Sequence, residues 1–418
     1  MCSGRQTMTF LDGYRVLDLT DARGLLAGRI LADLGADVVQ VEPANGSSAR
    51  SRAPRSGETS YLWEAFAANK RGIAVDFDSP DGVRAVRDLA AVADVVLESA
   101  GVGVMANRSL DYDDLRCLNE RLVYVSITAF GRNGPKAAYA ESDLVVWAAA
   151  GLVAVHRDGD RPPLRMSLPQ SYLHAAADAA SGALLALLAR ERTGRGQLVE
   201  IAAQTSVSCA TLGSVLADAV GDVPRDLETG APTRVDQSGS GSGTASALKK
   251  WQCADGVVEF HLGIGPAAGR FTGPFFAWMV DEGIGVQRFA ALDWRAVPTM
   301  MQAGEFTDDD MAAARAAVAD FLATKTKSEV LHAARDRKLL CVPVYDTTDV
   351  RTSEQLSARD YFVPVGDGDR RQLIPGRFAT VDIGPVTPSL PAPTLGEHSD
   401  IVGREWLGKS LRVGAGRD

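Results

Sequence analysis

Two glycine-containing stretches have the spacing of sites that bind phosphate. Residues 403–410 fit the pattern G-x-x-x-x-G-K-S, in which a loop before a helix holds phosphate with its backbone N–H groups. Only eight residues follow, and residues 401–407 themselves have a helical pattern, so we expect a helix that ends at Gly408. Residues 101–106 match G-x-G-x-x-A, but they follow the third expected strand, whereas a dinucleotide site needs the first. Here we expect a tight turn.

Other residue types that commonly do chemistry have no recognisable spacing. The five histidines form no H-x-x-x-H pair, so a zinc site is not expected. No G-x-S-x-G sequence exists, and the five cysteines form no C-x-x-C pair. Scattered cysteines of odd number indicate reduced thiols and a cytoplasmic protein. We expect no metal and no permanently bound cofactor.

The elements that would position a site alternate along the first half of the chain. Apolar strands are expected at residues 15–19, 36–42, 94–98 and 122–128, with helices between them. Strands separated by helices predict parallel β-α-β units and therefore a doubly wound α/β domain. A longer helix follows and ends in the basic turn at residues 190–197.

Composition changes after this turn. At 418 residues the chain exceeds the roughly 250–300 residues at which single cores stop growing, so two domains are expected. Residues 1–220 would form the large domain, 221–244 a linker rich in glycine and serine, 245–345 a smaller α+β domain and 346–384 a return linker. The net charge of −9 argues against a nucleic-acid partner, and no apolar run is long enough to predict a membrane span.

Six stretches, taken in order, resemble the class III CoA-transferases, the CaiB/BaiF family that includes formyl-CoA transferase, carnitine CoA-transferase and α-methylacyl-CoA racemase. They are GYRVLDLT (13–20) with LADLGADVVQVE (31–42), NKRGIAVDFDSPDG (69–82), LVYVSITAFGRNGP (122–135), RERTGRGQLVEI (190–201), CVPVYDTTDV (341–350) and PAPTLGEHSDIV (391–402). The resemblance implies an interlocked dimer whose large domain is completed by residues 385–418. It also implies that CoA or an acyl-CoA binds to the large domain as a substrate.

The resemblance places CoA-binding residues at two segments. Asn69, Lys70 and Arg71 correspond to the segment that meets the nucleotide end of CoA, where cationic side chains would pair with phosphates. Gly101 and Gly103 correspond to the family's turn that lies against the ligand.

Some positions depart from the family. Pro43 stands where an arginine is common, and Ser99-Ala100 replaces an Asn-Phe pair. Arg108 is a candidate for a replacement basic contact, and a solvated surface arginine is the alternative. The stretch SGSGSG, with Gly239, Gly241 and Gly243, resembles the loop that closes over the family's site, and a plain flexible linker is the alternative.

The family's nucleophile is the main departure. In the transferases an aspartate begins the helix before the R-x-R-T-G-R-G-Q turn, attacks the thioester and then carries CoA as an aspartyl thioester. Counting back from Gln197 places Tyr172 at this position, and a phenol is a poor acyl carrier. The histidine that pairs with this aspartate in racemases corresponds to Ser142. Asp178, Asp143 and Glu141 are the candidate replacement carboxylates.

Three hypotheses follow from the resemblance. In the first, the chain transfers CoA between an acyl-CoA and a carboxylic acid with an altered catalytic carboxylate. In the second, it is an acyl-CoA racemase, isomerase or lyase that uses Tyr172 as an acid. In the third, it is a non-catalytic subunit that pairs with an active homologue, or a binding protein. A homodimer is expected for the first hypothesis and a heteromer for the third.

Overall fold

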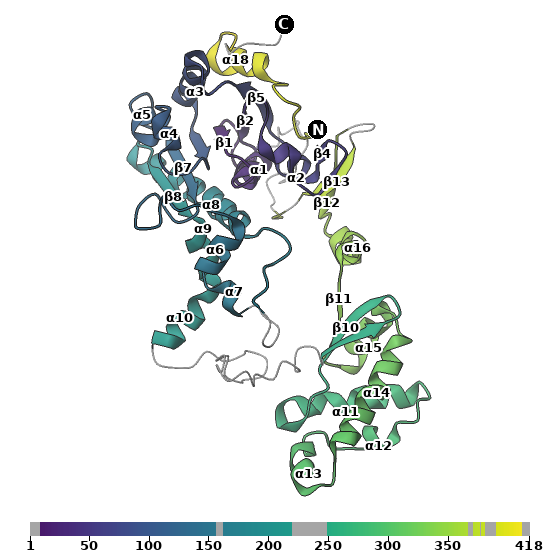
Figure 1. The fold of residues 1–418 in the computed structure, drawn as a ribbon. Coiled ribbons are helices and arrows are strands. Elements are labelled where there is room, and N and C mark those ends of the chain that lie inside the picture. Colours follow the sequence, from purple (N-terminus) through teal and green to yellow (C-terminus); the bar gives the residue numbers. More distant parts are fainter. Residues whose placement is uncertain are drawn as a thin grey trace. The chain divides into compact units, whose positions relative to one another are not determined.

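The computed structural model describes residues 9–155, 162–219, 249–366, 371–376, 378–380 and 390–411 (Figure 1). The chain forms two compact units. The first consists of Met1–His156, Pro163–Arg234 and Ser357–Asp418, and the second of Arg157–Pro162 and Val235–Leu356.

A six-stranded parallel sheet organises the first unit, in the order β5-β2-β1-β6-β7-β8. Its strands are β1 (Arg15–Leu19), β2 (Asp37–Pro43), β5 (Arg71–Val75), β6 (Val95–Glu98), β7 (Val123–Thr128) and β8 (Leu198–Ala202). The chain first builds outward from β1 to β5 and then returns to place β6 on the other side of β1. The doubly wound α/β fold predicted from the sequence is therefore confirmed.

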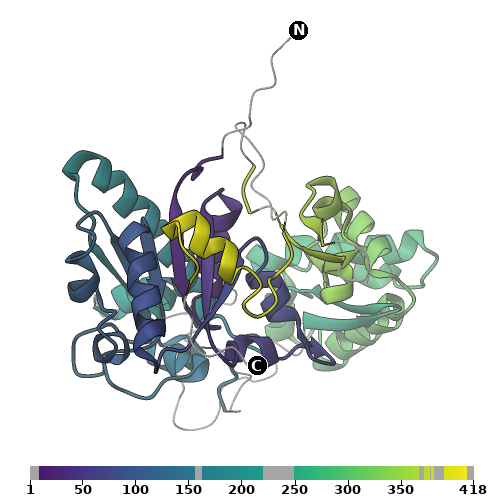
Figure 2. The same ribbon diagram turned by 90° about the horizontal axis from the view of Figure 1, so that it is seen from above.

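Helices cover both faces of this sheet. One face packs on α1 (Leu25–Asp33) and α8 (Ser171–Thr193), and the other packs on α3 (Pro80–Val92), α5 (Tyr112–Arg116) and α18 (Ser399–Leu407). The C-terminal helix α18 lies beside α3, far from it in sequence (Figure 2). It ends at Gly408 with a φ of 67°, as expected, so residues 403–410 are a helix end rather than a phosphate loop.

Helix α8 is 23 residues long, and its length and apolar composition would suffice to cross a membrane. One face consists of alanines, including Ala175, Ala179 and Ala183, which are buried in the core cluster of the sheet. Small side chains allow the helix to approach β7 and β8 closely. This alanine face identifies α8 as a packed element of the α/β core.

Shorter elements complete the first unit. They are η1 (Ser48–Ser51), β3 (Arg55–Ser56), β4 (Thr59–Ser60), α2 (Tyr61–Phe66), α4 (Val104–Asn107), α6 (Asp143–Ala149), α7 (Leu152–Val155), α9 (Ala203–Ser208), η2 (Cys209–Thr211), α10 (Leu212–Ala219), β12 (Phe362–Val365) and β13 (Gln372–Pro375). The last two form a hairpin, and α17 (Glu354–Ala358) connects the units.

The second unit has a three-stranded antiparallel sheet in the order β11-β10-β9. Its strands and helices are β9 (Lys250–Cys253), β10 (Gly256–Phe260), α11 (Gly265–Asp281), α12 (Gln287–Ala290), α13 (Val297–Ala303), α14 (Asp308–Ala323), α15 (Lys327–Arg337), β11 (Cys341–Val344) and α16 (Thr347–Arg351). The core is aromatic: Phe276 stacks on Trp294, and Phe260 stacks on Phe275.

Candidate functional site

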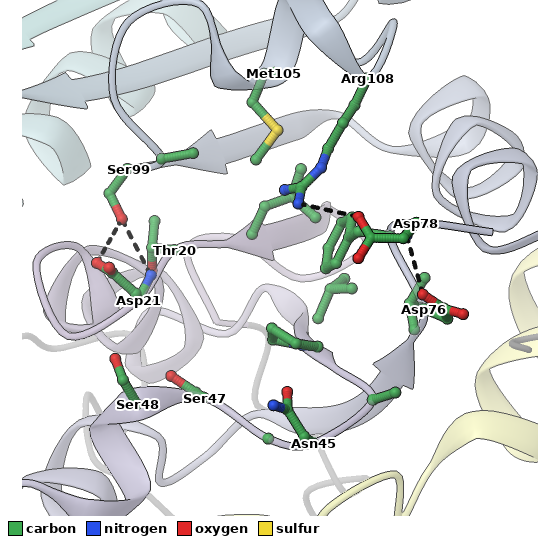
Figure 3. A pocket seen from close by; sticks show the side chains of 18 of the residues that line it. Thr20, Asp21, Asn45, Ser47, Ser48, Asp76, Asp78, Ser99, Met105 and Arg108 are labelled. Atoms are coloured by element: carbon green, nitrogen blue, oxygen red, sulfur yellow. Dashed lines mark hydrogen bonds and ion pairs between the residues drawn. The ribbon is translucent and has the colours of Figure 1, made fainter. Parts of the chain in front are cut away.

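A pocket of about 680 Å³ lies at the carboxyl ends of β1, β2, β5 and β6 in the first unit (Figure 3). This is the point at which the strand order reverses, and ligands of doubly wound folds bind in the crevice there. Its lining consists of Leu19, Thr20, Asp21, Arg23, Val41, Pro43, Ala44, Asn45, Gly46, Ser47, Ser48, Val75, Asp76, Phe77, Asp78, Ser99, Ala100, Met105 and Arg108. The topology thus identifies a ligand site without reference to any family.

Arg108 lines this pocket. Its guanidinium lies 3.7 Å from Asp78 and 5.1 Å from the centre of the Phe77 ring. Figure 3 shows the side chain directed toward the loop that carries Asp76 and Asp78. A second bond, from Asp78 N to Asp76 Oδ1 at 3.0 Å, orders this loop. Arg108 therefore belongs to the wall of the pocket, and its contact with a ligand stays a prediction.

The turn after β6 forms another wall. Glu98 holds it in place by accepting bonds from Ala100 N at 2.8 Å and from the Ser126 hydroxyl. Burial raises the pKa of Glu98. Gly101 and Gly103 have φ values of 90° and 81°, and an added Cβ at either would meet nothing within 4 Å. The backbone conformation therefore requires these glycines, and their contact with a ligand stays a prediction.

A chain of polar contacts runs from the pocket to the start of α8. Ser99 Oγ donates to Asp21 at 3.0 Å, and Arg23 pairs with Asp21 at 2.9 Å. Arg23 also pairs with Glu141, whose other carboxylate oxygen accepts the Tyr172 hydroxyl. The loop after β1, helix α8 and the segment before α6 are joined by this network.

The network sets the protonation of its members. Burial works to raise the pKa of Asp21, but its bonds from Arg23 outweigh burial and hold the pKa below its usual value. Burial raises the pKa of Tyr172 to about 12, since the side chain is only 8% exposed. Tyr172 is thus a protonated donor at neutral pH.

Asp143 has a structural role at the start of α8. Its Oδ1 accepts three bonds of 2.9 Å, from Gln170 N, Ser171 N and Ser171 Oγ. The first N–H groups of a helix have no partner within the helix, and a carboxylate satisfies them while complementing the helix dipole. Asp143 therefore caps α8.

Asp178 is not brought to this cluster. It lies on α8 six residues beyond Tyr172, which is about 9 Å along the axis and about 240° around it. Its side chain is exposed, whereas Tyr172 is buried. The structure therefore separates the first candidate carboxylate from the family position.

The polar residues of the segment Asn69–Arg71 have partners within the first unit. Lys70 is fully buried, and its Nζ donates to Asp18 Oδ2 at 2.7 Å, Leu25 O at 2.8 Å and Gln40 Oε1 at 2.9 Å. These bonds use all three N–H donors of the ammonium group, so none is left for a phosphate. A contact between Lys70 and a phosphate stays a prediction, and it would require the ammonium group to leave these partners.

Its neighbours are also engaged. Asn69 donates to Asp33 at 3.1 Å, and Arg71 pairs with Asp37 and Glu405. Arg71 begins β5 and pairs with Asp37, the first residue of β2, so its side chain lies toward the amino ends of these strands, whereas the pocket lies at the carboxyl ends. The described lining of the pocket does not include residues 69–71.

Other expectations have different outcomes. Gly239, Gly241 and Gly243 lie outside the described residues. No group of three or more His, Cys, Asp or Glu side chains in the described part of the chain could hold a metal ion. Sequence analysis missed Asp21 and Arg23, although a polar segment directly after the first strand of a β-α-β unit was a usable signal.

Comparisons with known proteins agree along the chain. The profile of CoA-transferase family III matches residues 11–399. Succinyl-CoA:(R)-benzylsuccinate CoA-transferase subunit BbsE of Thauera aromatica is 31% identical over 359 residues, covering 84% of this chain and 82% of that protein. Formyl-CoA:oxalate CoA-transferase of Streptomyces avermitilis is 27% identical over 406 residues, covering 93% of each.

A solved structure shows the same fold. The crystal structure of a CAIB/BAIF family protein from Brucella suis has a TM-score of 0.75 and 25% sequence identity, with 95% of this chain and 99% of that chain covered. Together with the profile match, this establishes that the chain belongs to CoA-transferase family III.

Proposed function

We propose that this chain is one subunit of a transferase that moves CoA between an acyl-CoA and a carboxylic acid, and that a homologous chain supplies the catalytic carboxylate. Membership of CoA-transferase family III supports the reaction class. The relative from Thauera aromatica is itself named as a subunit.

The proposal rests on one observation: the candidate carboxylates around the start of α8 are either already bonded to other groups or directed elsewhere. Among the described residues there, Glu141 has one oxygen bonded to Arg23 and the other to Tyr172. Asp143 caps the helix. Asp178 lies on another side of α8 and does not approach Tyr172.

Tyr172 is unsuited to the nucleophile's role. In CoA transfer by this family, a side-chain carboxylate accepts the acyl group to give an anhydride, and the CoA thiolate then attacks the side chain's own carbonyl carbon. A phenol has no carbonyl carbon to which sulfur can bond. With a pKa of about 12, Tyr172 is also ionised in only about one molecule in 10⁵ at pH 7.

One observation favours a second candidate function, in which the chain is active alone and Glu141 is the nucleophile. Glu141 lies beside Tyr172, and Arg23 and the Tyr172 hydroxyl would stabilise its carboxylate. This arrangement would need Glu141 to leave at least one of these partners before attacking a thioester.

Trapping with hydroxylamine separates the two functions. The complex is isolated with an affinity tag on this chain and incubated with succinyl-CoA and hydroxylamine, which converts an activated carboxylate into a hydroxamate. We expect peptide mass spectrometry to find the hydroxamate on a homologous partner chain. A hydroxamate on Glu141 would establish the second candidate, and one on Asp178 would contradict both.

Two variants of this chain test the same proposal. Glu141→Gln in this chain should leave trapping on the partner within about twofold, because the amide oxygen can still accept from Arg23 and the amide N–H can donate to the Tyr172 oxygen. Tyr172→Asp should introduce weak trapping at residue 172 by restoring a carboxylate at the start of α8.

A further inference from the structure

We propose that the pocket of this chain does not accept the phosphates of CoA, so that the transferase binds one CoA per pair of chains, in the pocket of the partner. This inference rests on the proposed function. It concerns the pocket at the reversal of the strand order, where the fold would place the ligand.

The charges of CoA define what its site must supply. CoA carries a diphosphate and a ribose phosphate, all negatively charged. Protein sites for such groups use lysine and arginine side chains, which form charge-assisted bonds, or free N–H groups at the start of a helix.

The described residues that line the pocket carry more negative than positive side chains. They include three aspartates, Asp21, Asp76 and Asp78, but only two cations, Arg23 and Arg108. Figure 3 shows Asp76 and Asp78 on the loop between β5 and α3. A phosphate in this pocket would approach more carboxylates than cations.

Both cations already have carboxylate partners. Arg23 is shared between Asp21 and Glu141, which are half-buried. Arg108 pairs with Asp78. If Arg23 turned toward a phosphate, it would leave these half-buried carboxylates without their partner, and the exchange would gain little. If Arg108 turned toward a phosphate, the phosphate would still lie in a pocket lined by Asp76 and Asp78.

Two cations of the first unit that lie outside the lining, Arg50 and Lys70, are held more firmly. Arg50 makes a two-point contact with Glu42, at 2.6 and 2.8 Å, and also donates to Pro393 O. The Glu42 and Asp18 side chains are fully buried, and they bind Arg50 and Lys70 respectively. A buried carboxylate that loses its cation is strongly destabilised, so these cations cannot serve a ligand.

The start of helix α3 does not supply this missing positive charge. Helix α3 starts beside the pocket, but the Ser79 hydroxyl already accepts Gly82 N at 3.0 Å. Asp78 precedes this helix and Asp81 lies in its first turn. Negative side chains therefore occupy the positions at which the helix dipole would attract a phosphate.

The test counts CoA molecules bound to the complete complex. Calorimetric titration of the isolated complex with CoA should give one site per pair of chains. Asp78→Lys in this chain reverses the charge at the loop and frees Arg108, so it should create a second site whose affinity falls at least tenfold between 50 and 200 mM salt. Asp78 tolerates this change structurally because 93% of its side chain is exposed.

Asp81→Lys is the matched control. It makes the same charge change one turn away, at an exposed residue outside the lining. We expect it to leave one site per pair. A second site in the unaltered complex, or in Asp81→Lys as well as Asp78→Lys, would overturn the inference, and so would its absence from Asp78→Lys.

Failure of this inference is distinguishable from failure of the proposed function. Mass spectrometry of the complex identifies the partner independently of CoA. A pair of different chains with two CoA sites would overturn only the inference. A homodimer that binds no CoA would overturn the proposed function, and of the inference it would leave standing only that the pocket of this chain does not accept CoA.

Discussion

Replacing Lys70 with methionine tests whether this residue stabilises the fold or binds a ligand. The methionine retains most of the side-chain volume but removes the ammonium group. Asp18 keeps the two bonds from Thr20, at 2.6 and 3.0 Å, and loses its partner at 2.7 Å. Since breaking a buried ion pair costs about 3–5 kcal/mol, and Thr20 retains part of the stabilisation, we expect a loss of about 3 kcal/mol.

Hydrogen–deuterium exchange measures this loss in the first unit alone. A loss of about 3 kcal/mol corresponds to exchange more than about 100-fold faster for peptides that cover β1 and α1. Arg71→Met is the control: its partners Asp37 and Glu405 are 39% and 53% exposed, so we expect a loss below about 1 kcal/mol. Unchanged exchange in Lys70→Met, together with weaker CoA binding by the complex, would refute the structural role.

Three further expectations follow from the same contacts. Gly28→Ala should destabilise the first unit despite the better helix propensity of alanine, because the new Cβ would lie 1.9 Å from Asp18 Oδ2; improved thermal stability would contradict this packing. Asp143→Ala should lower the free energy of unfolding, measured by urea denaturation, by about 1–2 kcal/mol because it uncaps α8. Asp143→Asn should retain most of the stability, and equal losses in the two variants would argue against the cap. Burial raises the pKa of Tyr172 from 10 to about 12, so the contribution of Tyr172 to stability should be complete below pH 10 and should disappear between pH 10 and 12. The free energy of unfolding of Tyr172→Phe should therefore fall less steeply over this pH range than that of the unaltered protein. An equally steep fall in both would contradict the prediction.

The elements of the first unit were largely predictable, because each depends on local pattern. The apolar runs at residues 15–19 and 122–128 are strands, and Ser79-Pro80 begins a helix as expected. The strand at Arg71–Val75 was missed, although the apolar residues before the helix start at Ser79 were a signal for it. Once this strand is recognised, Lys70 precedes it and Arg71 begins it, so both belong to the amino end of β5, whereas the pocket lies at the carboxyl ends of the strands.

The candidate site was predictable only in part. Arg108 lines a pocket, as do Ala100 and Met105 on either side of the turn at Gly101 and Gly103, because loops after parallel strands meet at one edge of a sheet. The partners of each charge were not predictable. Glu141 lies 31 residues from Tyr172 and 118 residues from Arg23, yet its carboxylate bonds to both.

The sequence alone determined the alternation of strands and helices, the family resemblance and the presence of Tyr172 where a carboxylate is expected. These follow from residue types and short spacings, which the chain carries wherever it folds. Tertiary structure decided which charged side chains are available to bind a ligand. Lysine after a turn resembles a ligand-binding cation in sequence, but burial against Asp18 makes Lys70 part of the core. Ion pairing acts through space between distant segments, so only the folded chain separates a structural charge from a functional one.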